Sequence, residues 1–202
     1  MLGRQALASP SPGDDARMGA VEKVRPRVSF ADLERAPEDG RRYELYDGEV
    51  YVVPAPMPRH QRVQIRLVEW LDDYVESVGG FAVCAPIDVV FSEYDVVQPD
   101  VLFFGPARAH LVDLDRAIRH APDLCVEILS PSTEVTDRGR KLQMFARYGV
   151  LEYWIVDPAH GVIEVHRLEA SGYVLAQRAT GNDEVRSSAV PGAALRAGSI
   201  FP

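Results

Sequence analysis

Two carboxylates lie in stretches of sequence that are otherwise apolar and typical of strands. Glu127 is the one charge in the run Leu124-Cys125-Val126-Glu127-Ile128-Leu129, and Asp100 directly precedes the apolar residues 101–104. An ionised carboxylate is costly to bury unless it has a partner, a proton or a metal ion. Two such acids on neighbouring central strands would supply the oxygen ligands that Mg²⁺ prefers. The sequence therefore predicts a divalent-cation site at Asp100 and Glu127, with the Ile128 carbonyl as a further candidate ligand.

Lysine is scarce in this chain, which has only Lys23 and Lys141. Lys141 follows Glu127 by 14 residues and falls in a predicted helix over residues 137–148. Lys141, Phe145 and Tyr148 stand at positions i, i+4 and i+7 and so share one helix face. The two aromatic residues indicate that this face packs inward and takes the lysine with it. The alternative is an exposed i, i+4 ion pair between Lys141 and Asp137.

The two acids also have structural alternatives. The alternative for Asp100 is a residue at a strand end that caps a neighbouring turn. The alternative for Glu127 is a buried structural ion pair with Arg140. Buried acids whose pKa values are perturbed nevertheless cluster at functional sites, which favours the metal-site interpretation.

The remaining pattern predicts the elements that must position these residues. We expect a short helix capped by Ser29 that ends near Gly40, and a long amphipathic helix over residues 58–78 ended by Gly79-Gly80. Asp47-Gly48 is a hairpin turn signal between strands 43–46 and 50–53. Further strands are predicted over 81–91, 96–104, 124–129 and 151–156, with a helical turn over 113–118 and a C-terminal hairpin of 161–168 and 173–177. This order predicts an α/β fold in which helices pack on a mixed sheet.

Size and composition limit the classes of protein that fit. A chain of 202 residues with 47% hydrophobic residues predicts one globular domain, over residues 27–202, preceded by a disordered tail, residues 1–26, rich in Ser, Pro, Gly and charge. The net charge of −8 argues against a broad basic surface but not against nucleic acid, because a metal ion and local arginines can bind phosphates. No apolar run is long enough to span a membrane, and the N-terminus has no segment of signal-peptide type. Cys84 and Cys125 lie in strand-like runs and are typical of reduced core residues, so we expect a cytoplasmic protein.

The motifs taken together resemble one known family. They are Tyr43-Glu44-Leu45, His60, Gln98-Pro99-Asp100, Val126-Glu127-Ile128-Leu129-Ser130, Asp137 with Lys141, and Glu152-Tyr153-Trp154-Ile155-Val156-Asp157-Pro158. Over residues 30–201 this string is similar to the Uma-two family of the PD-(D/E)XK restriction-endonuclease-like superfamily. The resemblance implies a four-stranded mixed core sheet flanked by helices, and a Mg²⁺-dependent site that cleaves phosphodiester bonds.

Carried over residue by residue, the resemblance makes Asp100, Glu127, Lys141 and Glu44 the candidate catalytic residues. Pro99-Asp100 matches the PD element and Glu127 the following acid. The superfamily's usual lysine lies two residues after that acid, where this chain has Leu129, and Lys141 would reach in from the next helix as its replacement. Asp100 and Glu127 would hold Mg²⁺ or Mn²⁺, and Lys141 would orient the attacking water or neutralise charge on the phosphorane.

Two of the resembling positions stay open on the sequence alone. Glu44 matches an acid that the superfamily often supplies near its first helix, but its alternation with Tyr43 and Leu45 fits a solvated hairpin glutamate equally well. His60 fits a core histidine, a helix N-terminal histidine or a catalytic one.

The sequence thus predicts a metal-dependent endonuclease acting on DNA. The alternative is a catalytically inactive nucleic-acid-binding or assembly module that retains the nuclease fold, which Leu129 and the acidic net charge favour. A homodimer is an option for either, because nucleases that cut both strands often pair by two-fold symmetry.

Overall fold

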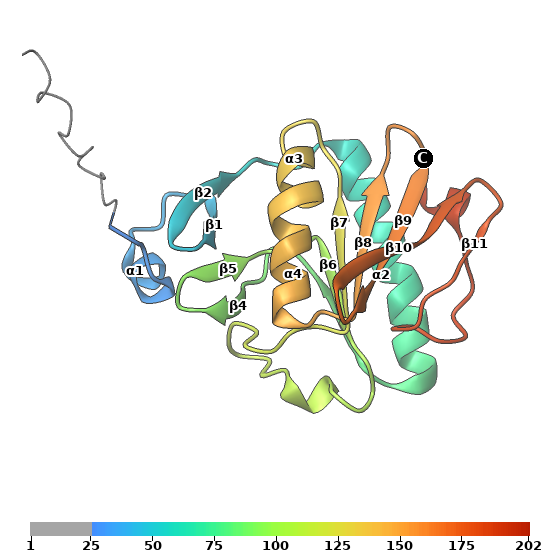
Figure 1. Cartoon of the computed structure of the whole chain (residues 1–202), viewed down its shortest axis with the longest axis horizontal. Coiled ribbons are helices and arrows are strands. Elements are labelled where there is room, and N and C mark those ends of the chain that lie inside the picture. The colour runs from blue at the N-terminus through green and yellow to red at the C-terminus, as the bar shows by residue number, and fades with distance from the viewer. Residues whose placement is uncertain (1–25) are drawn as a thin grey trace, which may run out of the picture.

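A computed structural model of the chain describes residues 26–202 (Figure 1). Its helices are α1 (Phe30–Arg35), α2 (Pro58–Val78), α3 (Glu134–Thr136) and α4 (Leu142–Tyr148), with 3-10 turns η1 (Ala109–Leu111) and η3 (Ala197–Ile200) and a π-helical turn η2 (Asp137–Lys141). Its strands are β1 (Arg42–Tyr46), β2 (Glu49–Val53), β3 (Phe81–Cys84), β4 (Val89–Ser92), β5 (Asp95–Val97), β6 (Val101–Phe104), β7 (Leu124–Ile128), β8 (Glu152–Asp157), β9 (Val162–Glu169), β10 (Gly172–Thr180), β11 (Glu184–Val185) and β12 (Leu195–Arg196). The predicted tail, residues 1–26, lies outside the described residues except for Pro26, so the limits of the predicted domain stay a prediction.

The larger sheet has six strands in the order β10-β9-β8-β7-β6-β3. Strands β7 and β8 run parallel, while β3, β6, β9 and β10 pair with their neighbours antiparallel, so the sheet is mixed, as predicted. Its strands β8-β7-β6-β3 are the four-stranded mixed core that the resemblance implies. The predicted C-terminal hairpin, β9 and β10, extends this core at one edge.

A second sheet has the order β2-β1-β5-β4 and lies with α1 to one side of the larger sheet (Figure 1). It contains the predicted N-terminal hairpin, whose turn residues Asp47 and Gly48 both have positive φ, 53° and 78°. Such a turn matches the twist of the two strands it joins, which is why an Asp-Gly pair predicts it. Ser29 caps α1 through a capping box with Asp32, as the sequence indicates.

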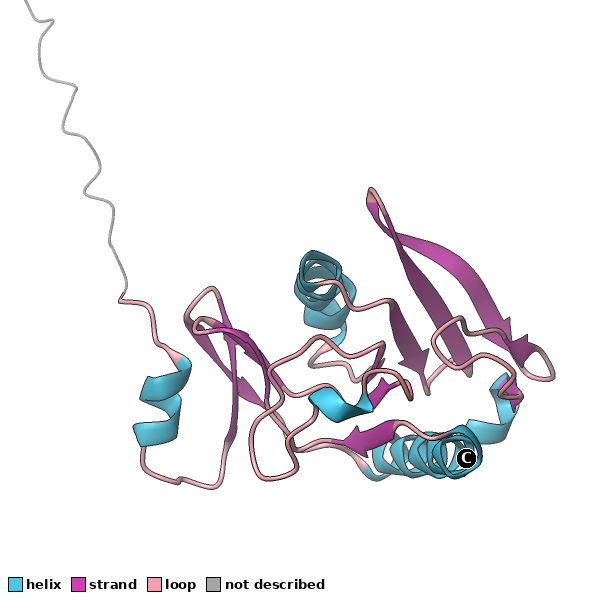
Figure 2. Ribbon diagram, turned by 90° about the horizontal axis from the view of Figure 1, so that it is seen from below, coloured by secondary structure: helices cyan, strands magenta, loops and turns pink. Residues whose placement is uncertain are grey.

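Helices cover both faces of the larger sheet (Figure 2). On one face α2 buries Val63, Leu67 and Leu71 completely, at the helical spacing that predicted it. On the other face Phe145 of α4 is buried completely in a second apolar cluster. The two faces of β6 and β7 therefore contribute alternate residues to two separate cores.

The structure corrects several predicted boundaries. The two strands expected over 81–91 and 96–104 are four, because the chain leaves the larger sheet after β3, forms β4 and β5 in the smaller one, and returns as β6. Pro86 and Pro99 lie at these crossings, where the missing backbone donor cannot continue a ladder. The helical turn expected over 113–118 is limited to one hydrogen-bonded turn, from Asp113 to Arg116, because Ile118 forms a β-bridge with Val89.

The helix that carries Lys141 also differs in form from the prediction. It begins at Glu134 and passes from α3 through the π-helical turn η2 into α4, whereas the sequence pattern predicts a plain α-helix from Asp137. The extra residue of a π-helical turn changes which side chains point inward, and such turns are frequent at functional sites. None of the helices within residues 26–202 is both long and apolar enough to cross a membrane.

Candidate active site

Asp100 and Glu127 come to one face of the larger sheet because β6 and β7 are antiparallel neighbours. Val101 pairs with Val126 in this antiparallel pair. Asp100, which precedes Val101, therefore stands opposite Glu127, which follows Val126. Both acids line a cavity of about 430 Å³ between the sheet, the N-terminal end of α2 and the helix that carries Lys141. The two side chains therefore line one cavity, as a shared metal site requires.

Lys141 lies inside this cavity and is only 6% exposed. Its Nζ atom donates to Oε1 of Glu127 at 2.8 Å and lies 3.0 Å from Oε1 of Glu44. The predicted inward face is confirmed, since Phe145 is buried and Tyr148 half-buried. The alternative of an exposed ion pair with Asp137 is wrong, because both side chains are buried.

Glu44 enters the cavity from β1, and the solvated-hairpin alternative is wrong. Its side chain is 6% exposed. Oε1 accepts the backbone N–H of Gln98 at 2.9 Å, and Oε2 accepts the hydroxyl of Tyr46 at 2.8 Å. These bonds tie the smaller sheet to the strand end that carries Asp100 and place Glu44 beside Lys141.

Asp100 is held by two partners on different elements. Its Oδ2 atom accepts the backbone N–H of Ile128 at 2.8 Å and lies 3.0 Å from Nε2 of His60. Gln64, one turn along α2, donates to the Asp100 carbonyl at 2.8 Å. Asp100 thus accepts a backbone N–H, as the alternative of a strand-end capping residue requires. It also lines the cavity. The sequence leaves open whether His60 is a core, a helix N-terminal or a catalytic histidine. In the structure it lies at the start of α2 and lines the cavity.

Asp137 is a cavity residue that the sequence analysis named among the family-like motifs, but to which it gave no role beyond an exposed pair with Lys141. It is 1% exposed, and neither carboxylate oxygen has a hydrogen-bond partner within residues 26–202. Nζ of Lys141 lies 3.7 Å from its Oδ1. The i, i+4 spacing between Asp137 and Lys141 indicates in the sequence that the two side chains lie close together. It does not predict that the pair is buried, because burial depends on the sheet packed against η2.

The alternative pairing of Glu127 with Arg140 is also wrong. Glu127 pairs with Lys141, while Arg140 is half-exposed and pairs with Glu49 and the Tyr51 hydroxyl. Leu129, at the position of the superfamily's usual lysine, is 8% exposed and packs in the apolar cluster under α4. Lys141 is therefore the lysine that contacts Glu127.

The cavity holds more negative than positive charge. Burial raises the pKa of Glu127 well above its ordinary value, Lys141 opposes this, and the carboxylates of Asp100, Asp137 and Glu44 add to it. Burial likewise raises the pKa of Asp137, and the positive charge of Lys141 again opposes this increase. Burial alone would lower the pKa of Lys141, but the carboxylates around it, Glu127 foremost, raise it well above its ordinary value. Lys141 is thus held as an ammonium ion among acids that a further cation would stabilise.

The donor set fits a hard divalent cation held by few protein ligands. Within residues 26–202 there is no group of three or more His, Cys, Asp or Glu arranged to hold a metal ion. Mg²⁺ commonly takes only one or two carboxylates and completes its shell with water and substrate phosphate. Asp100 and Glu127 offer two carboxylates on one cavity wall, and the excess of negative charge favours such an ion.

Comparison with known proteins relates the chain to one family. The model of the Uma2 family, described as "Putative restriction endonuclease", matches residues 30–198. An uncharacterised protein of Synechocystis is 26% identical over 138 residues, which cover 65% of this chain and 68% of that protein.

One solved structure has the same fold. It is described as "a putative nuclease belonging to DUF820" from Anabaena variabilis, and it superposes with a TM-score of 0.71 at 20% sequence identity. The match covers 86% of this chain and 97% of the other. The likeness confirms the restriction-endonuclease-like fold that the sequence predicts.

Proposed function

The chain belongs to the Uma2 family, and from this premise we propose that it is a metal-dependent endonuclease that hydrolyses phosphodiester bonds in DNA. The observation that carries the proposal is the convergence of Asp100, Glu127 and Lys141 on one cavity from two strands and a helix. Two carboxylates can hold a divalent cation, and an ammonium ion can stabilise the negative charge that develops when a phosphodiester is hydrolysed.

Asp100 and Glu127 would hold Mg²⁺ or Mn²⁺ in this proposal. When bound, the ion would polarise the scissile phosphate and lower the pKa of a water molecule. The contacts of His60 and the Ile128 N–H with Asp100 fix the orientation of that carboxylate. Loss of such a contact to a metal ligand typically lowers metal affinity by about 10–100-fold.

Lys141 would place a fixed positive charge beside the phosphate oxygens, where negative charge develops in the transition state. Glu44 acts with Asp137 to hold its ammonium group in the cavity, since both carboxylates lie beside Nζ. Glu44 is therefore proposed as the fourth residue of the catalytic set, with its effect exerted through Lys141.

The test is cleavage of DNA by the purified chain with Mg²⁺ or Mn²⁺. Asp100→Asn and Glu127→Gln should each lower the rate at least about a hundredfold, because each removes a charged metal ligand. Asp113→Asn is the matched control, since Asp113 is a carboxylate on an exposed loop, where it pairs with Arg116 and accepts the backbone N–H of Asp115. Equal rates for the wild type and the two site variants would refute the assignment.

The second candidate, a non-catalytic nucleic-acid-binding or assembly module, is favoured by one observation. Lys141 is already paired with Glu127 and Glu44, and Leu129 leaves no second lysine at the usual position. Isothermal titration with Mn²⁺ in parallel with the cleavage assay separates the two. A chain that binds DNA but neither binds the ion nor cuts would support the module.

Other properties follow from the same proposal. We propose DNA as the partner and the cytoplasm as the location of the protein. We also propose a homodimer, because two subunits related by two-fold symmetry would cut both strands of a duplex. Light scattering of the purified chain, with and without DNA, determines the oligomeric state.

A further inference from the structure

The candidate catalytic groups lie below the surface of the molecule. Glu127 is 3% exposed and Lys141 5%, and the cavity around them is walled by the end of β2 and the residues that follow it. That segment, from Val52 to Met57, presents exposed apolar side chains at the cavity rim. Because Glu127 is buried, a phosphodiester must enter the cavity to contact it, and its flanking nucleotides would then lie at the rim.

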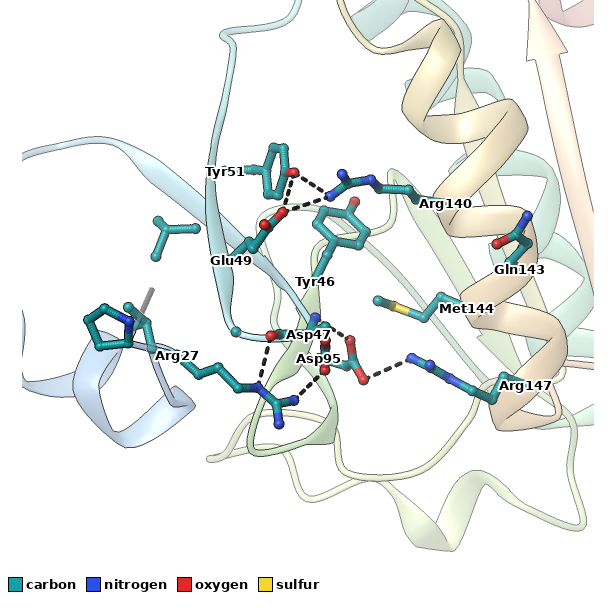
Figure 3. A pocket seen from close by; sticks show the side chains of 14 residues that line it. Arg27, Tyr46, Asp47, Glu49, Tyr51, Asp95, Arg140, Gln143, Met144 and Arg147 are labelled. Atoms are coloured by element: carbon teal, nitrogen blue, oxygen red, sulfur yellow. Dashed lines mark hydrogen bonds and ion pairs between the residues drawn. The ribbon is translucent and has the colours of Figure 1, made fainter. Parts of the chain in front are cut away.

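A second and larger hollow adjoins the cavity. It has a volume of about 1310 Å³ and lies between the β1–β2 hairpin and the helix formed by η2 and α4 (Figure 3). Tyr46 and Tyr51 line both the hollow and the catalytic cavity. The two spaces therefore share a wall, and we call the larger one the hairpin groove.

The hairpin groove carries cationic and aromatic side chains. Arg27, Arg140 and Arg147 line it, and Figure 3 shows Arg140 and Arg147 reaching from the helix toward the hairpin. The Arg140 guanidinium lies 4.8 Å from the centre of the Tyr51 ring. Guanidinium groups beside aromatic rings are the combination with which proteins bind single-stranded nucleic acid, through phosphates and through stacked bases.

Two of the three groove arginines, Arg27 and Arg140, are paired by exposed contacts that a phosphate can replace, whereas Arg147 pairs with the buried carboxylate of Asp95. Arg140 and Glu49 are 49% and 56% exposed, and Arg27 and Asp47 are 49% and 83% exposed. Exposed ion pairs of this kind contribute little stability. A nucleic-acid phosphate can therefore take the place of Glu49 or Asp47, although the acids of the groove keep the binding weak and sensitive to salt.

We propose that the substrate of the site is single-stranded DNA, whose scissile phosphate enters the catalytic cavity while the adjoining nucleotides lie along the hairpin groove. The inference rests on the proposed function and deepens it by naming the form of the substrate. A single strand can splay its nucleotides around the rim, whereas a duplex would first have to open. Arg140, which lies beside Tyr51, is the residue that would guide the strand from groove to cavity.

The first test compares cleavage of one labelled oligonucleotide alone and annealed to its complement, at equal concentration with Mn²⁺. We expect the single strand to be cut at least about tenfold faster, because the duplex must pay for unstacking. Equal or faster cutting of the duplex would overturn the inference while leaving the proposed endonuclease intact. If neither form is cut, the proposed function fails, and the binding test below still decides where a single strand binds.

The second test measures binding of the same two DNA forms by fluorescence anisotropy in EDTA. The wild type should bind the single strand more tightly than the duplex. Tyr51→Ala should weaken single-strand binding by about tenfold, the loss expected for one stacked base. Arg140→Ala should weaken it and reduce the slope of log affinity against log salt by about one.

The matched control for Arg140→Ala is Arg116→Ala. Arg116 is also an exposed arginine in an ion pair, but it lines neither the groove nor the cavity. Its affinity and salt slope should equal those of the wild type. Losses of similar size in Arg116→Ala and Arg140→Ala would indicate non-specific charge effects and overturn the groove assignment.

Discussion

Nζ of Lys141 lies 2.8 Å from Oε1 of Glu127, and both side chains are almost completely buried. The pair joins the centre of the larger sheet to the helix packed on it. The same ammonium group lies 3.0 Å from Glu44 on the smaller sheet. One lysine thus links three elements and also faces the cavity where the two candidate metal ligands meet, so that its structural and proposed catalytic roles cannot be separated by its position alone.

Replacing Lys141 should cost stability. Lys141→Met leaves Glu44, Glu127 and Asp137 buried without their cation, and loss of one partner from a buried ion pair costs about 3–5 kcal/mol. We expect a clear fall in the free energy of unfolding at neutral pH, measured by urea denaturation. Arg116→Met, in an exposed pair with Asp113, should change it little. A Lys141 variant as stable as the wild type would show that the acids are already protonated in the native state.

Replacing Glu127 should have the opposite effect on stability. Its pKa is raised by burial and by neighbouring carboxylates, so its charged form is costly at neutral pH. Glu127→Gln removes that charge and leaves Lys141 beside Glu44 and Asp137. We expect a melting temperature equal to or above that of the wild type together with loss of Mn²⁺ binding in calorimetry. A large fall in melting temperature would instead mark Glu127 as chiefly a structural partner of Lys141.

His60 should act on metal affinity through Asp100. Nε2 of His60 lies 3.0 Å from Oδ2 of Asp100, and Nδ1 is buried without a hydrogen-bond partner among residues 26–202. His60→Ala should weaken Mn²⁺ binding by about 10–100-fold, the usual loss when a group that orients a ligand is removed. His110→Ala, at an exposed position, is the control. Unchanged affinity in His60→Ala would restrict His60 to packing.

His166 should make the fold sensitive to acid. Burial lowers its pKa from 6.5, although Glu164 opposes this, so the unfolded chain binds a proton more readily than the native one. The stability that neutral His166 contributes is present above pH 6.5 and is lost as the pH falls from there toward the folded pKa.

The measurement is the difference in melting temperature between about pH 7.5 and about pH 5.5, a window that spans the unfolded pKa. That difference should be smaller in His166→Gln than in the wild type. His120→Gln, at an exposed position, should keep the wild-type difference. An identical pH dependence in His166→Gln and the wild type would contradict the prediction.

The α/β fold, the long helix α2 and the two hairpins are predictable from the sequence alone, because periodicity, turn residues and caps act over short distances. The sequence also marked Asp100 and Glu127 as candidates, since isolated charges in apolar runs are costly and rare, and Lys141 because it shares a predicted helix face with Phe145 and Tyr148. It did not foresee the π-helical turn η2, the division of the expected strands between two sheets, or the burial of Glu44. Each of these depends on which segments pack together over long distances in the chain.

The clearest limit of sequence reasoning is the contrast between Glu127 and Glu152. Both are acids in apolar strands, and β7 and β8 are parallel neighbours. Glu152 is 0% exposed, but the hydroxyls of Ser187 and Ser188 and the indole of Trp154 donate to its oxygens, so it holds the C-terminal segment in place. Glu127 has one ammonium partner and an open cavity instead. Only the tertiary structure distinguishes them, because the groups that satisfy or expose a buried charge come from elsewhere in the chain.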